Sequence, residues 1–326
     1  MTVATGCGST TLDTAPPAIQ SAGPADSPPV TASPVGAVSP LGGHPQAATF
    51  DKRTQQLAVL TPGPHPADPG TVFMLHAGQT PPRVIELPGP ATALTGDSDG
   101  AAYLSGRGGY FVVDLAAGSV SRVEIDGARD ADFTAIARRA DRTMMLGTAD
   151  GTVYALAAPS AVAKRTRVPG RVDSLTAQGN TVVVLDRTQT SVTTIDADGA
   201  VAQALRAGQG AATVAADPLG RVLVADPRGG QLLVYGVDPL ILRQAYPVRQ
   251  APYGLAGSPA LTWVSQTAAN MVIGYDLSTG IPVERVRYPT VRQPNALAFD
   301  DVSGTLFVVS GSGAGVQVIE HAAGPR

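Results

Sequence analysis

The sequence lacks the features that identify several large classes of protein. No run approaches the roughly 20 apolar residues that a transmembrane helix requires. Only 15% of the 326 residues are charged, and both signs are interspersed to a net charge of -3. No basic surface for nucleic acid or an anionic membrane is therefore expected. No window shows the 3.6-residue periodicity of an amphipathic helix, which argues against an α-helical repeat protein.

Motifs that carry chemistry are also scarce. There is no Gly-x-Ser-x-Gly sequence, and Ser310-Gly311-Ser312-Gly313 is interpreted as a turn. The histidines show no spacing typical of a zinc site and are interpreted as surface residues. They are His44, His65, His76 and His321. Two acidic turns, Asp97–Gly100 and Asp196–Gly199, lack the remaining ligands of a Ca²⁺ loop. The sequence predicts no catalytic residue, no metal and no cofactor.

What the sequence does contain is a repeated unit, clearest between Ala211 and Gln250. Four short apolar runs in this stretch are separated by Pro- and Gly-containing turns, which predicts an antiparallel four-stranded meander. The runs are Thr213–Ala216, Arg221–Ala225, Leu232–Tyr235 and Leu242–Val248. Val184, Val224 and Val264 occupy equivalent places 40 residues apart. A four-stranded unit of roughly this length is typical of a propeller blade.

Counting in both directions gives seven units and predicts an all-β, seven-bladed β-propeller over residues 44–326. The units begin near Ala47, Ala91, Ala131, Arg171, Ala211, Ala251 and Val291. Aromatic residues make up only 5% of the chain and small residues are abundant, which suits sheets that converge on an axis. The last unit has three clear strands. We expect an N-terminal strand within Pro29–Val38 to complete it, because prolines are tolerated at a sheet edge.

Residues 1–43 are expected to form a lipidation remnant and a disordered linker. The only cysteine, Cys7, follows the small residues Val3-Ala4-Thr5-Gly6. This stretch resembles the end of a bacterial lipoprotein signal, although the apolar region that should precede it is absent. Either the start codon is assigned too far downstream or the signal has been trimmed; a chance cysteine is the alternative. The Pro-, Ser- and Ala-rich residues 8–43 bury too little apolar surface to fold alone.

Residues 171–320 resemble the YVTN and NHL-like seven-bladed propellers of secreted bacterial proteins. Together with Cys7 and the Pro-rich linker, the chain looks like an actinobacterial, mycobacterial-type lipoprotein. This resemblance implies the fold and an extracytoplasmic, membrane-anchored location, and says little about function. The residues that carry it are Gly254-Leu255-Ala256, Leu261–Ser265, Val272–Gly280, Pro294–Asp300, Gly304–Ser310 and Val316–Ile319.

The loops that lead into the first strand of each unit are the predicted binding site, because propellers commonly bind ligands at the mouth of the central channel. Their side chains mix both charges and one aromatic, which suits a polar ligand or a protein loop; polar loops that merely face water are the alternative. The candidates are His44, Gln46, Thr92, Asp130, Asp132, Arg171, Asp173, Gln209, Arg249, Tyr253, Arg292 and Asn295.

These observations favour a non-enzymatic, lipid-anchored binding or scaffolding platform outside the cytoplasmic membrane. Its expected partner is an envelope or membrane protein, or a polar small ligand, with no nucleic acid, and the chain itself is expected to be monomeric. The alternative is a lactonase-like hydrolase that uses a divalent cation at the channel mouth, for which Asp132 and Asp173 are the residues to test.

Overall fold

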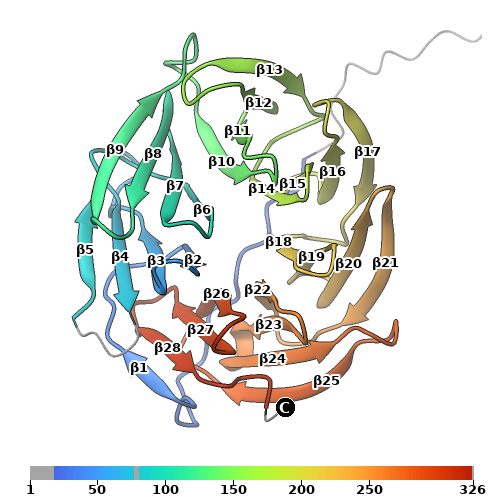
Figure 1. Ribbon diagram of the computed structural model, residues 1–326. Helices are drawn as coiled ribbons and strands as arrows, with labels where there is room; N and C mark the ends of the chain where they lie inside the picture. The colour runs from blue at the N-terminus through green and yellow to red at the C-terminus, as the bar shows by residue number, and fades with distance from the viewer. Residues whose placement is uncertain (1–17, 77–80, 325–326) are drawn as a thin grey trace, which may run out of the picture.

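The computed structural model describes residues 18–76 and 81–324. Within them the chain forms seven four-stranded antiparallel sheets arranged around an axis (Figure 1). The predicted seven-bladed β-propeller is confirmed. The first strand of each blade lies nearest the axis and begins within three residues of the expected unit start.

Six blades are built from consecutive strands. They are β2 (Ala47–Asp51), β3 (Gln56–Thr61), β4 (Thr71–His76) and β5 (Arg83–Glu86); β6 (Ala93–Gly96), β7 (Ala101–Gly106), β8 (Gly109–Asp114) and β9 (Ser119–Glu124); β10 (Phe133–Arg138), β11 (Met144–Thr148), β12 (Thr152–Leu156) and β13 (Val162–Arg167); β14 (Ser174–Gln178), β15 (Thr181–Asp186), β16 (Ser191–Ile195) and β17 (Val201–Arg206); β18 (Thr213–Asp217), β19 (Arg221–Asp226), β20 (Gln231–Val237) and β21 (Leu240–Pro247); and β22 (Pro252–Gly257), β23 (Thr262–Gln266), β24 (Met271–Asp276) and β25 (Val283–Pro289), with the 3₁₀ turn η1 (Thr267–Ala269) between β23 and β24.

The seventh blade joins the two ends of the chain. It contains β26 (Pro294–Asp300), β27 (Thr305–Ser310), β28 (Val316–Ile319) and, as its outer strand, β1 (Ala37–Ser39). Val38 of β1 lies opposite Gln317 of β28 in an antiparallel pair. The N-terminal closing strand is thus as predicted, although it lies at the end of the expected range and extends one residue past it.

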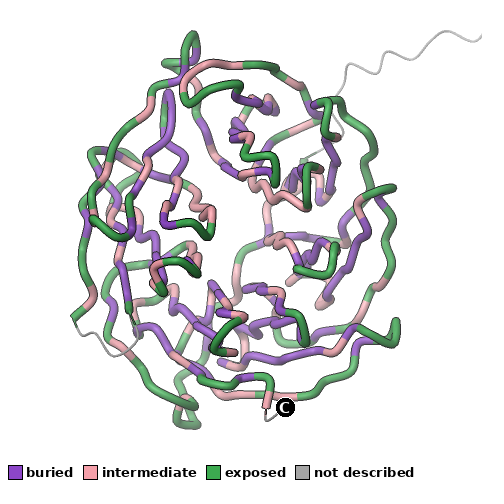
Figure 2. Tube along the Cα trace, viewed as in Figure 1, coloured by how far each residue is buried: buried purple, intermediate pink, exposed green. Residues whose placement is uncertain are grey.

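The core lies between the blades. The second and third strands are covered on both faces by neighbouring sheets, so they read as continuous apolar runs, such as Leu57–Leu60 of β3, which are fully buried. Each of the seven apolar clusters joins two adjacent blades. The fourth strands face solvent, and all of β17 is exposed. Figure 2 shows this change from buried middle strands to an exposed rim.

The aromatic residues follow the same arrangement. Trp263, the only tryptophan, is fully buried and stacks on Phe299 with ring centroids 5.8 Å apart. Because Phe299 lies in the next blade, this pair packs one sheet against another. A fully buried side chain of this kind contributes about 2 kcal/mol or more through its apolar area.

The N-terminal residues that precede β1 require a correction. The sequence assigned residues 1–43 to a disordered linker, of which residues 1–17 lie outside the described part. Residues 18–36 instead lie against the ring and pass behind the inner strands in Figure 1. Hydrogen bonds attach them, among them Ile19 N to Thr188 O at 2.9 Å and Asn270 Nδ2 to Pro28 O at 2.8 Å. Ser27 is buried. The segment has too few apolar residues to fold alone, and hydrogen bonds to the propeller hold it in place.

Among the described residues, no helix is long and apolar enough to cross a membrane.

Candidate binding site at the channel mouth

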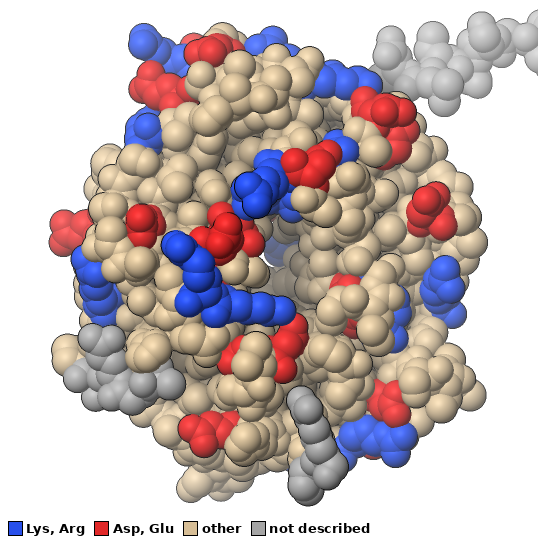
Figure 3. Space-filling view, viewed as in Figure 1, with Lys and Arg blue, Asp and Glu red and all other residues tan. Residues whose placement is uncertain are grey.

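One face of the ring gathers the loops that lead into the first strands and the turns between second and third strands. We call it the mouth face. Residues 18–28 lie across this face, with bonds to blades four to seven. Figure 3 views the ring from the opposite side, where basic and acidic side chains surround the central opening.

Several charges on that opposite face are paired with one another or with turns. Arg138 lies 3.1 Å from Asp97, and Arg139 lies 2.8 Å from Asp141. Asp97 also accepts bonds from Asp99 N and Ala101 N, so this carboxylate closes its own turn. Burial alone would raise the pKa of Asp97, but these bonds and Arg138 bring it below its ordinary value. The described residues contain no group of three or more His, Cys, Asp or Glu that could hold a metal ion.

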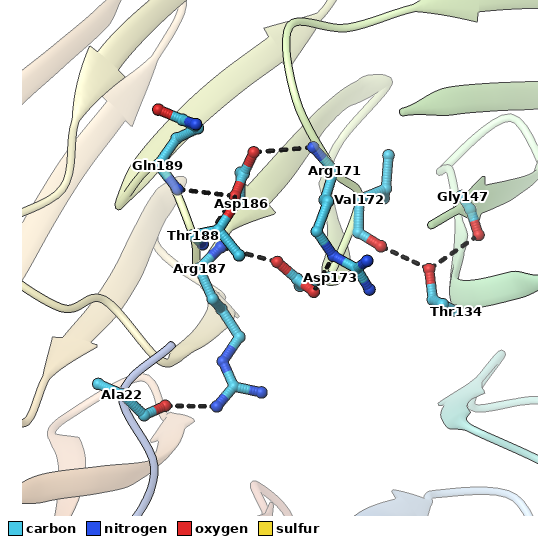
Figure 4. Close-up of polar contacts among 10 residues, drawn as sticks. All are labelled: Ala22, Thr134, Gly147, Arg171, Val172, Asp173, Asp186, Arg187, Thr188 and Gln189. Carbon is cyan, nitrogen blue, oxygen red and sulfur yellow. Dashed lines mark hydrogen bonds and ion pairs between the residues drawn. The ribbon is translucent and has the colours of Figure 1, made fainter. Parts of the chain in front are cut away.

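Buried carboxylates shape the mouth face. Asp186, at the end of β15, accepts bonds from Arg171 N at 2.8 Å and from Thr188 N at 2.8 Å, and so joins a lead-in loop to the turn after β15 (Figure 4). Asp226 repeats this arrangement one blade later with Gln209 N at 2.8 Å and Gly229 N at 2.7 Å. Both carboxylates are visible in the sequence repeat, as an Asp directly after VVVL and an Asp directly after VLVA.

The mouth face opens into a cavity of about 490 Å³ on the channel axis. Its floor is apolar and consists of first-strand side chains, including Leu94, Ile136, Leu175 and Val214. Pro24 of the N-terminal segment forms part of its wall. Its polar lining consists of Gln46, Thr92, Asp173, Ser174, Arg187, Thr213, Tyr253 and Asn295.

Five of the twelve predicted site residues meet at this cavity, and seven do not line it. Gln46, Thr92, Asp173, Tyr253 and Asn295 line it. The other seven share an exposed position on the rim of the mouth face: His44, Asp130, Asp132, Arg171, Gln209, Arg249 and Arg292. Their role in binding stays a prediction.

Several of these residues have defined structural partners. Thr92 Oγ1 donates to Phe133 O at 2.8 Å, which links two blades. Asn295 Oδ1 accepts a bond from Gln293 Nε2 at 3.1 Å. His44 Nδ1 lies 3.2 Å from Gly311 O. Arg292 Nε donates to Ser27 O at 3.2 Å and so contacts the N-terminal segment. The site is therefore held in place by its own polar contacts.

Asp130 and Asp132 lie apart from the channel. They line a shallow depression of about 550 Å³ together with Asp150. A hydrogen bond from Thr148 lowers the pKa of Asp150, against the effect of burial. Arg107 approaches Asp130 at 3.9 Å, and the Asp130 side chain is 94% exposed. The pair is thus a weak surface contact.

Arg187 is the functional candidate that the sequence reading missed. It follows Asp186 in the turn after β15, and its guanidinium reaches into the cavity and donates to Ala22 O (Figure 4). Its Nε atom is buried without a hydrogen-bond partner. Burial raises the pKa of the Tyr253 hydroxyl, while the charge on Arg187 acts in the opposite direction. The predicted mouth residues all come from the lead-in loops, whereas Arg187 comes from the turn between β15 and β16.

Comparison with known proteins supports the fold class. No protein-family model and no curated protein matches the chain. Among solved structures, a streptogramin B lyase is similar with a TM-score of 0.67 and 12% identity, covering 88% of this chain and 97% of that one. Hydrazine synthase of Kuenenia stuttgartiensis is similar with a TM-score of 0.68 and 14% identity, and the match covers 88% of this chain and 98% of that one. A chain of a mitotic checkpoint complex is similar with a TM-score of 0.72 and 11% identity, and the match covers 92% of this chain and 98% of that one.

These likenesses define the chain as a β-propeller. At 11–14% identity they show the fold alone and carry neither activity nor partner to this chain.

Proposed function

We propose that the protein is a lipid-anchored, extracytoplasmic propeller whose mouth face serves as a binding platform for an envelope protein or a polar ligand. The carrying observation is the cavity of about 490 Å³ at the mouth, which has an apolar floor and a small set of convergent polar groups. Binding pockets combine these two features. The same face already holds an extended stretch of polypeptide, residues 19–28, through side chains of the ring.

The anchor rests on the small residues before Cys7, which lies outside the described residues. Ile19 is bound to the mouth face through Thr188. The twelve residue steps from Cys7 to Ile19 can span at most about 40 Å. A lipid on Cys7 would therefore keep the mouth face close to the bilayer, where an envelope partner could be reached.

Metabolic labelling with an azido-fatty acid tests the anchor. The unaltered chain should take up the label and stay with the membrane fraction, and Cys7→Ala should lose both. Ser9→Ala, in the same stretch, should keep both. Labelling and membrane retention that survive in Cys7→Ala would refute the anchor.

Site-specific photo-crosslinking in cells tests the platform. A photoreactive amino acid at Gln209, exposed on the mouth face, should yield discrete adducts that depend on that position. The matched control is Ile281, which is 70% exposed in the turn between β24 and β25 on the opposite face. Equal adducts from both positions, or none from Gln209, would refute the mouth face as the platform. No observation favours the hydrolase alternative, which is not proposed here.

A further inference from the structure

Arg187 is a cation at a partly enclosed cavity with no anionic partner. Among the described residues, no carboxylate oxygen lies within 4.0 Å of its guanidinium, and Arg187 differs from the other unpaired basic side chains in lining this cavity. In Figure 4 one guanidinium nitrogen is bonded to Ala22, and no dashed line reaches the other two. An arginine has five N–H donors, and most of them are unused here.

The one acid in the cavity lining makes its hydrogen bonds to other groups. Asp173 lines the same cavity, but one of its oxygens accepts the Arg187 backbone N–H at 2.8 Å and the other accepts Arg171 Nε at 3.2 Å. Asp173 therefore pairs with Arg171 on the rim. Arg187 is half-buried, and its Nε atom is buried without a partner, so a ligand with acceptor oxygens would satisfy donors that the protein leaves unused.

We propose that the cavity binds a small organic anion, with a carboxylate or phosphate group against Arg187 and an apolar body on the channel floor. Arginine binds both groups through paired N–H donors. The floor residues Leu94, Ile136 and Leu175 offer the apolar body a surface without charge. This inference rests on the proposed function and names the ligand class for that same mouth.

The N-terminal segment limits the size of the ligand. Pro24 closes part of the wall, and Ala22 O engages one guanidinium nitrogen and so leaves the rest available. A volume of about 490 Å³ suits a small molecule and falls within the usual range for ligand sites. A protein loop of the expected partner would have to bind elsewhere on the rim, so the two forms of recognition can be tested separately.

Fluorine NMR with the full chain tests the proposal with three probes. These are 4-(trifluoromethyl)benzoate, 4-(trifluoromethyl)phenyl phosphate and the neutral 4-(trifluoromethyl)benzamide. At least one anion should bind about tenfold more tightly than the benzamide, since a charge-assisted pair is lost in the amide. The tighter of the two anions identifies the head group as carboxylate or phosphate.

Three variants locate the binding site. Arg187→Gln should weaken binding of the anion about tenfold, and Arg187→Lys should recover part of it by restoring the charge. Arg129→Gln, exposed in the loop that leads into β10 and outside the cavity lining, should change it by less than about twofold. The proposal is overturned if neither anion binds better than the benzamide, or if Arg187→Gln binds as well as the unaltered chain. If Arg187→Gln does not fold, the comparison of the two anions with the benzamide on the unaltered chain still tests the proposal. Crosslinks from Gln209 that persist without anion binding would refute this inference and leave the platform intact.

Discussion

At the scale of single residues, a left-handed backbone position recurs in the mouth-face turns of the fourth, fifth and sixth blades. Thr190, Gly230 and Asn270 follow one another at 40-residue spacing and have φ angles of 45°, 63° and 51°. A β-branched residue rarely adopts this conformation. Thr190 is held there by its hydroxyl, which donates to Ala207 O and Gly208 O at 2.9 Å. The repeat therefore conserves a backbone angle across three different side chains.

Replacing Gly230 tests that requirement. A Cβ at this position would meet nothing closer than Val248 O at 3.6 Å, so there is room for it. Gly230→Ala should nevertheless lower the free energy of unfolding by about 1 kcal/mol because of the left-handed backbone. Gly230→Asn should cost less, since Asn tolerates this region and already occupies it at position 270. Urea unfolding of both variants measures the difference. An alanine variant as stable as the unaltered chain would contradict the requirement.

Alignment of the repeats predicted which loops meet at the mouth, but not which side chains enter the cavity. Gln46, just before β2, lines it, whereas Gln209 and Arg249, in the loops that lead into β18 and β22, do not. A repeat fixes where a backbone passes. The direction of each side chain depends on local contacts, such as the Asp186 carboxylate that orients the turn bearing Arg187. Single-sequence reasoning contains no term for these contacts.

At the scale of strands, closure of the ring depends on a short edge strand and one buried amide. β1 contributes three residues to the seventh blade. Gln317 of β28 is fully buried, and its Nε2 donates to Val35 O at 2.7 Å and to Pro289 O at 3.0 Å. Its Oε1 accepts a bond from Val291 N at 3.1 Å. One side chain thus joins the N-terminal segment, β25 and the loop into β26.

Gln317→Leu tests this junction. The leucine fits an apolar core but leaves Val35 O and Val291 N without partners, and it removes one of the two hydrogen bonds to Pro289 O. The free energy of unfolding should therefore fall by about 3 kcal/mol. Gln209→Leu is the matched control: its side chain is exposed and should cost less than about 0.5 kcal/mol. Chemical denaturation followed through the fluorescence of Trp263 gives both values. Equal losses in the two variants would contradict a structural role for the Gln317 amide.

Apolar runs and turn residues predicted the start of each blade to within three residues, and the four strands of the fifth blade to within two, because these features are local. The closing strand was predicted only as lying somewhere in Pro29–Val38. β1 is short and has no large apolar pattern of its own. The position of β1 is set by its partner strand β28. Gly36, just before β1, lies so close to β28 that an added Cβ would be 2.1 Å from Val318 O. Such specification is invisible in the segment itself.

At the scale of the whole molecule, residues 18–39 connect four blades that are otherwise joined only to their neighbours. The segment bonds to Thr188 in the fourth blade, Arg228 in the fifth and Thr267 in the sixth, and then completes the seventh as β1. Composition predicted disorder here because the segment buries little apolar surface. Hydrogen bonds to the ring hold the segment instead, and the composition of the segment alone cannot predict these partners.

Gln293 provides the sharpest test of this attachment. Its Oε1 accepts Ser27 N at 2.9 Å and its Nε2 donates to Ala25 O at 2.8 Å, so one amide pairs with the segment as another peptide group would. Gln293→Ala should speed hydrogen exchange in residues 19–28 by about tenfold, the effect of losing roughly 1.4 kcal/mol of local stability. Exchange in β19, buried in the core, should not change.

Gln209→Ala is the control for the hydrogen-exchange measurement, because Gln209 lies on the same face and its side chain makes no hydrogen bond to residues 18–28. Exchange in residues 19–28 that is already unprotected in the unaltered chain would show that these residues do not stay on the mouth face in solution. Protection that survives in Gln293→Ala would show that other contacts hold the segment, with Ser27 Oγ bonded to Thr267 O as the next to remove. Faster exchange confined to residues 19–28 would show that the segment is released as a unit while the ring stays closed, because β1 is held separately through Gln317 and β28.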